Sequence, residues 1–413
     1  MSTLWRNREF NLLWTSQSLS DLGGAIAQLA LPLLVLELTG SPVRAGVVGT
    51  IALVVAHATR LPAGLLADRV DRRRAMLACD VVRLLAFLAL AAAVAAGRAT
   101  LTVIIVVAVL DAACGALFNT TEHAALRSIV PTAQLPDAVA RNEVRTYSAS
   151  LAGPPLGGLL FGVTHALPFL GNALSYLISF AGVALIRRPL QAERDEPSAG
   201  HAAALAEGLR FVFGNPFLRA VMIILAPLNF ALSGVTFTII VALQRHGVEP
   251  GVIGLTSTIV GVGGLAGAIA APLLQRWLPL PRLIRFICWA AAAVLTCSAW
   301  LTTSVAAAVP VAMAVFLGPS CNAALFGYQA AITPDRLQGR VLSVILLAAM
   351  SAAATAPVLS GVFVTLWGPG RTILAFAVTV TVAALTATLA SGIRTVRIGP
   401  SARLSTERGG SAS

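Results

Sequence analysis

The feature that most constrains this chain is a succession of apolar segments, each long enough to cross a lipid bilayer. They span residues 11–38, 45–67, 75–96, 99–121, 138–162 and 164–186 in the first half, and 217–243, 252–275, 281–302, 305–329, 338–366 and 370–393 in the second. A helix rises about 1.5 Å per residue, so each segment spans a hydrocarbon core of about 30 Å. The sequence therefore predicts an all-α integral membrane protein with twelve transmembrane helices.

The composition agrees with burial in lipid rather than in water. Of the 413 residues, 57% are hydrophobic and 11% are charged, whereas a soluble domain carries roughly 25% charged residues. In a soluble chain the net charge of +12 would suggest nucleic-acid binding. Here the charges lie in short breaks between apolar segments, where a positive cytoplasmic side explains them. We therefore expect a lipid bilayer and no nucleic acid as a partner.

The arginines are unevenly divided between alternate breaks. One set holds Arg6, Arg8, Arg69, Arg72, Arg73, Arg74, Arg127, Arg141, Arg145, Arg187, Arg188, Arg194, Arg210, Arg219, Arg276, Arg282, Arg285, Arg336 and Arg340. The alternate breaks hold only Arg44, Arg98, Arg245 and Arg371. The positive-inside rule then predicts that both termini lie in the cytoplasm.

The two halves of the chain have related sequences. Arg44–Gly49 opens the second segment much as Pro250–Gly254 opens the eighth, and Gly153-Pro154 matches Ala356-Pro357 in depth. We expect six-helix bundles at residues 1–186 and 217–393, related by pseudo-twofold symmetry. Residues 187–216 are predicted to form a cytoplasmic linker with an amphipathic helix from His201 to Phe213. The Ser-, Gly- and Arg-rich tail, residues 394–413, is predicted to be disordered.

The break between the second and third segments holds a specific motif. Gly64-Leu65-Leu66-Ala67-Asp68-Arg69-Val70-Asp71-Arg72-Arg73-Arg74 resembles the signature G-x-x-x-D-R-x-G-R-R/K-R/K of the major facilitator superfamily. Gly64 would allow close approach of a neighbouring helix, and Asp68 could accept hydrogen bonds from a helix N-terminus. Asp71 replaces the second glycine, which leaves the tight turn of the family in doubt.

This resemblance implies a cytoplasmic gate. In the superfamily the partner of the aspartate is the start of the eleventh helix, here around Leu337 to Arg340, and the contact holds the cytoplasmic side shut. The implied gate residues are Gly64, Asp68, Arg69, Arg72, Arg73 and Arg340. The alternative is that the arginines only anchor the helices at the positive cytoplasmic side.

A second motif lies in the fifth segment. Ala149-Ser150-Leu151-Ala152-Gly153-Pro154-Pro155-Leu156-Gly157-Gly158 resembles the antiporter signature G-x-x-x-G-P-x-x-G-G, with Ala149 at the first glycine. Gly153, Pro154, Gly157 and Gly158 would kink the helix and let it pack closely against the other half. In the superfamily this pattern accompanies exporters, and simple packing of small residues is the alternative.

Three further stretches are similar to the branch that contains enterobactin exporters and macrolide efflux proteins. They are Leu38–Pro42, Phe169–Tyr176 and Glu207–Phe213. The resemblance implies a secondary transporter in a bacterial cytoplasmic membrane that exports a drug, siderophore or secondary metabolite by alternating access, in exchange for protons. An importer or lysolipid flippase of the same fold, or a transport-dead sensor or assembly subunit, is the alternative.

In this superfamily the first, fourth, seventh and tenth helices line a central cavity. Polar residues recur at helical spacing on all four: Gln17, Asp21, Gly24 and Gln28; Asp111, Gly115, Asn119 and Glu122; Asn229, Ser233 and Thr236; and Asn322 and Gln329. Lipid would penalise such stripes, so we expect them to face a watery interior. The candidate cavity residues are Gln17, Gln28, Arg60, Asn119, Asn229, Ser233, Asn322 and Gln329. For the amides, hydrogen bonding between helices is an equally good interpretation.

Two carboxylates, Asp21 and Asp111, are the candidate proton-coupling residues. Each lies about ten residues into its helix, about 15 Å deep, where an unpaired carboxylate costs several kcal/mol. The alternative is a structural ion pair with Arg60 or Arg83. Many drug–proton antiporters carry Arg four residues before a Gly in the fourth helix, whereas this chain has Asp111 before Gly115. The proton relay associated with that arginine therefore cannot be carried over.

The sequence shows no pattern typical of an enzyme. We find no nucleophile–base pair, zinc cluster or phosphate-binding glycine loop, so we expect no catalysis, no cofactor and no metal. The five cysteines lie in apolar segments without metal-ligand spacing. We expect a monomer that binds a small-molecule substrate.

Overall fold

The computed structural model describes residues 3–190, 201–277, 280–334 and 337–390, and all regular elements there are helical. Within these described ranges, ten helices are long and apolar enough to cross a membrane. They are α1 (Arg8–Thr39), α4 (Arg72–Ala95), α5 (Leu101–Ile129), α7 (Leu167–Leu185), α9 (Pro216–Arg245), α10 (Pro250–Trp277), α11 (Leu280–Ser298), α12 (Ala308–Ile332), α13 (Gln338–Trp367) and α14 (Pro369–Leu389). Each coincides with one predicted segment to within a few residues, apart from α5, which is longer at its C-terminal end.

The predicted segment 45–67 is not one continuous helix. It is divided into α2 (Pro42–Ala58) and α3 (Arg60–Arg69). Pro62 has no N–H to donate to the Ala58 carbonyl, and its ring crowds that carbonyl. The Thr59 hydroxyl also donates 2.6 Å to the Val55 carbonyl, a bond that favours bending. The proline therefore explains where α2 ends.

The fifth predicted segment is the continuous helix α6 (Leu135–Val163). It is absent from the ten strongly apolar helices; its first eleven residues carry Asp137, Arg141, Glu143 and Arg145, and the rest is rich in Gly, Pro and Ser. With α6 and the α2–α3 pair, the described chain has the twelve helical spans that the sequence predicts.

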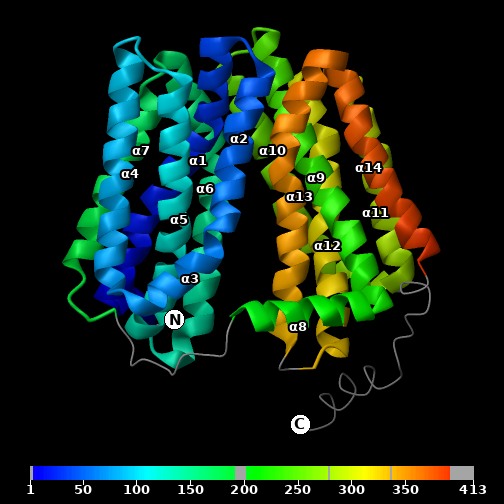
Figure 1. Ribbon diagram of the computed structural model, residues 1–413, viewed down its shortest axis with the longest axis horizontal. Helices are drawn as coiled ribbons and strands as arrows, with labels where there is room; N and C mark the ends of the chain where they lie inside the picture. The colour runs from blue at the N-terminus through cyan, green and yellow to red at the C-terminus, as the bar shows by residue number, and fades with distance from the viewer. Residues whose placement is uncertain (1–2, 191–200, 278–279, 335–336, 391–413) are drawn as a thin grey trace.

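The helices form two bundles (Figure 1). Helices α1–α7 make the first and α9–α14 the second, and α8 (His201–Gly214) lies across one end of the second. The bundles meet through α2 with α13 and through α6 with α10. In Figure 1 their ribbons converge at the end where α2 and α10 begin, and diverge toward the end that carries α3 and α8.

The contact between α2 and α13 is a backbone contact made possible by glycine. A Cβ on Gly46 would overlap the carbonyl oxygen of Pro357, and a Cβ on Gly361 would overlap that of Pro42. Each helix therefore supplies one glycine and one proline carbonyl to the other. Such close approach is typical of helix pairs that associate in membranes.

The contact between α6 and α10 repeats this arrangement. A Cβ on Gly254 would overlap the carbonyl oxygen of Pro154, and a Cβ on Gly158 would overlap that of Pro250. The two interfaces exchange equivalent groups between equivalent helices of the two halves. The sequence similarity between the halves thus corresponds to a pseudo-twofold relation in the structure.

Helix α8 occupies the residues where a helix was expected, His201 to Phe213, and it attaches to the second bundle. Val212 is fully buried in a cluster with Phe217 and Val341, and Phe211 packs against the same cluster. Leu209 and Phe213 on α8 are exposed. Residues 191–200 of the predicted linker and the disordered tail expected at 394–413 lie outside the described residues.

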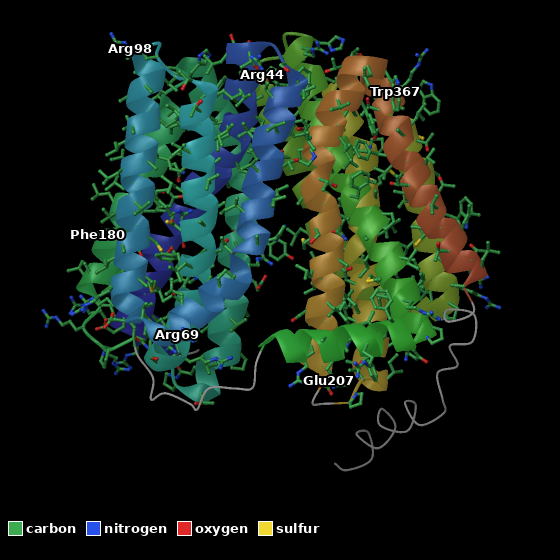
Figure 2. All side chains as sticks on the ribbon, in the orientation of Figure 1. Arg44, Arg69, Arg98, Phe180, Glu207 and Trp367 are labelled. Carbon is green, nitrogen blue, oxygen red and sulfur yellow. The ribbon has the colours of Figure 1, made fainter. Side chains whose placement is uncertain are left out.

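Large apolar side chains cover much of the outer surface of both bundles (Figure 2). Val163 and Ile269 are 71% and 76% exposed, and Leu85, Trp277 and Val378 are also exposed. A water-soluble protein avoids such a surface, whereas lipid favours it. The exposed side chains agree with the predicted membrane location.

Candidate functional site

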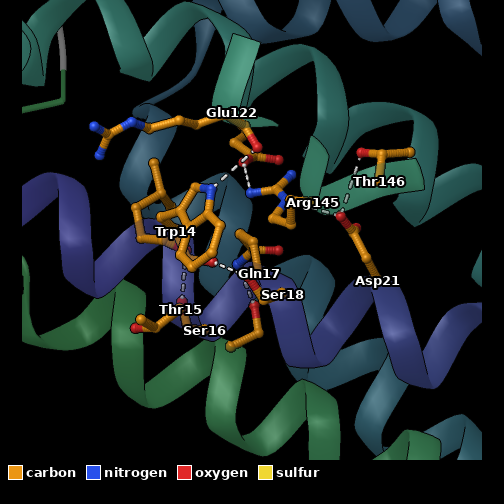
Figure 3. A network of polar contacts seen from close by, with 12 residues as sticks. Trp14, Thr15, Ser16, Gln17, Ser18, Asp21, Glu122, Arg145 and Thr146 are labelled. Carbon is orange, nitrogen blue, oxygen red and sulfur yellow. Dashed lines mark hydrogen bonds and ion pairs between the residues drawn. The ribbon is translucent and has the colours of Figure 1, made fainter. Parts of the chain in front are cut away.

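An arginine with two carboxylate partners lies inside the first bundle (Figure 3). Arg145 of α6 places Nε 2.8 Å from Oδ2 of Asp21 on α1, and Nη1 2.8 Å from Oε1 of Glu122 on α5. The side chains of Arg145 and Glu122 are 6% and 4% exposed, whereas that of Asp21 is 27% exposed. The cluster therefore joins three helices and opens to the outside through Asp21.

Asp21 lies on the wall of a cavity of about 200 Å³. The cavity is lined by Gln17, Ser20, Asp21, Gly24, Ala25 and Gln28 of α1, Arg83 of α4, Phe118 and Asn119 of α5, and Thr146, Ala149 and Ser150 of α6. The predicted residues Gln17, Asp21, Gln28 and Asn119 are thus brought together. The polar stripe of α1 faces this cavity, and a Cβ on Gly24 would meet nothing within 4 Å.

Asp111 occupies a different environment from Asp21. Its Oδ1 lies 2.8 Å from Nε of Arg83 and accepts a 2.8 Å hydrogen bond from the Tyr176 hydroxyl. The Arg83 guanidinium also lies 4.0 Å from the centre of the Tyr176 ring. The ion pair with Arg83, one of the two pairings left open by the sequence, is the one observed. Arg60 is exposed and makes neither predicted ion pair.

A fourth carboxylate, Asp80 of α4, is fully buried. Its Oδ2 accepts a 2.7 Å hydrogen bond from Ser179 of α7, whose hydroxyl accepts a 2.8 Å hydrogen bond from Gln17. Because Gln17 also lines the cavity, a polar chain runs from the cavity wall to Asp80.

The predicted cavity residues of the second bundle do not line this cavity. Asn229 donates to the Leu225 carbonyl of its own helix, Gln329 is buried and donates to Thr333, and Asn322 is exposed. Ser233 is half-buried. Local bonds along their own helices satisfy the two amides, so helical spacing alone was a poor guide to their surroundings.

The gate motif is ordered by local contacts rather than by a tight turn. Asp71 has φ −65° and caps α4, accepting a 2.9 Å hydrogen bond from the Arg74 amide. Arg72 donates to the carbonyls of Ala124 and Leu190, and Arg73 donates to that of Ala184. The replacement of glycine by Asp71 therefore supplies a helix cap, and no left-handed residue is needed.

The predicted gate residue of α13 contacts α8 in this conformation. Arg340 forms an ion pair with Glu207 of α8, and Arg69 is exposed. A Cβ on Gly64 would meet nothing within 4 Å, so the close approach expected there is not found in this conformation. The side chain of Asp68 lies outside the described residues.

The glycines of α6 allow close contact with two different helices, α1 and α10. A Cβ on Gly153 would overlap Ala25 of α1, and one on Gly157 would crowd the carbonyl of Ile26. Gly158 and the Pro154 carbonyl face α10 instead. Close packing against the other half is thus made by part of the motif, and the rest packs within the first bundle.

Sequence reasoning missed the central position of Arg145 and the burial of Asp80. Arg145 was assigned to the cytoplasmic anchors, although it lies about ten residues into α6. That depth was the available signal. Asp80 is preceded by apolar residues, and its burial becomes evident only once α7 is packed against α4. Among the described residues, no group of three His, Cys, Asp or Glu side chains is placed to hold a metal.

Comparison with known proteins gives consistent results. The multidrug efflux pump Tap of Mycolicibacterium fortuitum is 27% identical over 275 residues, which are 62% of this chain and 64% of that protein. An uncharacterised MFS-type transporter of Bacillus subtilis, YfiS, is 25% identical over 272 residues, 64% of each chain. The chain thus matches somewhat less than two thirds of the length of these relatives.

Solved structures share the fold at low sequence identity. An inward-facing bacterial homologue of the human lysosomal transporter Spinster has a TM-score of 0.73 and 15% identity, covering 95% of this chain and 98% of that one. An inward-facing bacterial homologue of the iron transporter ferroportin has a TM-score of 0.70 and 16% identity, covering 92% and 98%. The nucleoside transporter NupG has a TM-score of 0.69 and 12% identity, covering 94% and 100%.

A family model matches residues 13–328, which include nearly all of the first bundle and most of the second. Together with the twelve spans, this match shows that the chain belongs to the Major Facilitator Superfamily of membrane transporters.

Proposed function

We propose that this transporter exports small amphipathic molecules in exchange for protons. The observation that carries the proposal is the cluster of Asp21, Arg145 and Glu122 on the wall of the cavity. One arginine cannot neutralise two carboxylates. Asp21 and Glu122 together therefore bind a proton at low energetic cost. A cargo that contacts Asp21 competes with Arg145 and with that proton, which is the requirement for exchange.

Alternating access follows from rocking one bundle against the other. The glycine–carbonyl contacts of α2 with α13 and α6 with α10 close one end, and the bundles diverge at the end with α3 and α8. With that end in the cytoplasm, as the arginines predict, this conformation is inward-facing. In the outward-facing state, Asp68, Arg69 and Arg340 would then close the cytoplasmic end, after Arg340 leaves Glu207.

The cavity favours a neutral or cationic cargo. Its walls offer the amides of Gln17, Gln28 and Asn119, the hydroxyls of Ser20 and Thr146, and the carboxylate of Asp21. Arg83 is the cation on the wall, and its Nε is held by Asp111. The similarity to a protein named as a multidrug efflux pump supports export over import.

We further propose that the protein acts as a monomer in a bacterial cytoplasmic membrane, with both termini in the cytoplasm. The two relatives are bacterial. The arginine-rich breaks all fall on the side of α8 under this topology.

Growth inhibition of an efflux-deficient bacterial host tests this function. The host would express the wild type, Asp21→Asn or Asp137→Asn, and would be exposed to a panel of antibiotics, dyes and siderophores. Asp137 is an exposed carboxylate in the first turn of α6, and so serves as the control. Protection by the wild type and the control, but not by Asp21→Asn, is expected for at least one compound. Increased sensitivity with the wild type would indicate import and contradict the proposal.

A further inference from the structure

Asp80 is the one carboxylate of the first bundle's polar network that has no cationic partner within the described part of the chain. The network contains Asp21, Asp80, Asp111 and Glu122 against Arg83 and Arg145. Arg83 is paired with Asp111, and Arg145 is shared by Asp21 and Glu122. If all four carboxylates were ionised, the network would carry two uncompensated negative charges inside the membrane, which is energetically prohibitive without protonation.

The immediate surroundings of Asp80 offer one hydrogen bond. The residue is 0% exposed, and Ser179 donates to Oδ2, while Oδ1 is buried without a hydrogen-bond partner among the described residues. A buried carboxylate requires several donors or a cation to remain ionised. One neutral hydroxyl does not meet that requirement.

The charged groups near Asp80 do not change this conclusion. Arg83 lies one turn further along α4, and its charge is already taken by Asp111 and the Tyr176 ring. Glu122 of α5 is a carboxylate paired with Arg145, so it offers Asp80 no positive charge. The side chains that connect to Asp80 from α7 and α1, Ser179 and Gln17, are neutral.

We propose that Asp80 is a proton-binding site of this transporter, occupied by a proton in the conformation described here. Oδ2 serves as the carbonyl acceptor for Ser179, and Oδ1 holds the proton. The site differs from the Asp21–Arg145–Glu122 cluster because it is closed to the outside and has no counter-ion among the described residues.

The site communicates with the cavity through two hydrogen bonds. Gln17 lines the cavity and donates to Ser179, which donates to Asp80. A cargo that engages the Gln17 amide withdraws its hydrogen bond from Ser179 and changes the environment of the Asp80 carboxyl. A role for this chain in driving export rests on the function proposed above, whereas the protonation of Asp80 does not.

Infrared spectroscopy of the purified protein in lipid vesicles tests the proton site. A protonated carboxylic acid has a C=O stretching band that is separate from the bands of a carboxylate. Spectra would be recorded at pH 7 for the wild type, Asp80→Asn and Asp137→Asn, without any cargo. We expect the Asp80→Asn substitution to remove an acid band that the wild type and the Asp137→Asn control both show. Loss of carboxylate absorption instead, with the acid region unchanged, would overturn the proposal.

Ser179→Ala provides a second, independent readout. It removes the hydrogen bond to Oδ2, so the acid band should persist and move to higher frequency. A band that does not move would overturn the assignment, even if Asp80→Asn could not be purified. The infrared spectra are recorded without cargo, so they test the proton site independently of transport. If the proposed export is wrong, the acid band of Asp80 is still present. If the proton site is wrong, that band is absent whatever the transport activity.

Discussion

Gly158 of α6 lies so close to Pro250 of α10 that a Cβ on the glycine would overlap the proline carbonyl. Gly361 of α13 makes the corresponding contact with Pro42 of α2. At both interfaces the backbone of one helix contacts the backbone of the other directly. These contacts hold the two bundles together at the end opposite α8. Any side chain added there forces the bundles apart.

The first prediction concerns this interface. Gly158→Ala should cost about 1–3 kcal/mol of interface free energy, because the carbonyl of Pro250 is backbone and cannot rotate away. The conformation closed at this end should become less populated. Thiol labelling of a cysteine placed at Val43, near the start of α2, should accelerate by roughly 5- to 150-fold, since 1.4 kcal/mol is a factor of ten.

Gly162→Ala is the matched control on the same helix. A Cβ at Gly162 would meet nothing within 4 Å, and alanine is the better helix former by about 1 kcal/mol. Its labelling rate should equal that of the wild type. Equal rates for all three proteins would refute the role assigned to Gly158.

The second prediction concerns the ion pair between Arg83 and Asp111. Asp111→Asn should lower the free energy of unfolding by about 2 kcal/mol, since it leaves a largely buried guanidinium without its counter-ion. The double variant Arg83→Gln/Asp111→Asn should recover most of this loss, because no buried charge remains. Thermal unfolding in detergent would measure both. Additive losses in the double variant would show that the pair is not coupled.

The third prediction concerns the cap of α4. Asp71→Ala should destabilise the helix start by about 1 kcal/mol, because the Arg74 amide loses its acceptor. Asp71→Asn should be neutral, since asparagine caps equally well. Hydrogen exchange at the Arg74 amide would report this directly: it should speed up in the alanine variant alone. Faster exchange in the asparagine variant would mean that the charge, and not the cap, matters.

The fourth prediction concerns the ion pair between Glu207 of α8 and Arg340 of α13. Both side chains are more than a third exposed, so Glu207→Gln should change the free energy of unfolding by less than about 1 kcal/mol. It should nevertheless free Arg340 for the gate and favour the outward-facing state. Distances between spin labels on α3 and α13 should shorten in a larger fraction of molecules. An unchanged distribution would remove Glu207 from the account of gating.

The sequence sufficed for the helices but not for their polar partners. Twelve spans, the helix at His201 and the resemblance of the halves follow from local composition and spacing, and the structure contains each of them. Pro62 is the sequence signal for the break at Thr59. The prediction missed the break because the apolar segment continues across it.

Partners across helices depend on rotation and depth, which spacing along one helix does not give. Asp21 was expected to face water or to pair with Arg60 or Arg83, yet it pairs with Arg145 of α6. Asn229 and Gln329 belong to helical stripes of polar residues, as Gln17 and Asn119 do. Their side-chain amides, however, donate hydrogen bonds to Leu225 and Thr333 along their own helices. The first bundle carries the described cavity because its polar stripes from α1, α5 and α6 converge.

The most direct test of proton-driven export is transport into inverted membrane vesicles that are acidified inside. The transported compound is one against which the wild type protects the host in the growth assay. The wild type should accumulate the compound and lose the accumulated fraction on addition of a protonophore. Asp21→Asn should still exchange the compound at equilibrium but should not concentrate it, and Asp137→Asn should behave as the wild type. Accumulation by Asp21→Asn equal to that of the wild type, or accumulation insensitive to the protonophore, would contradict the account.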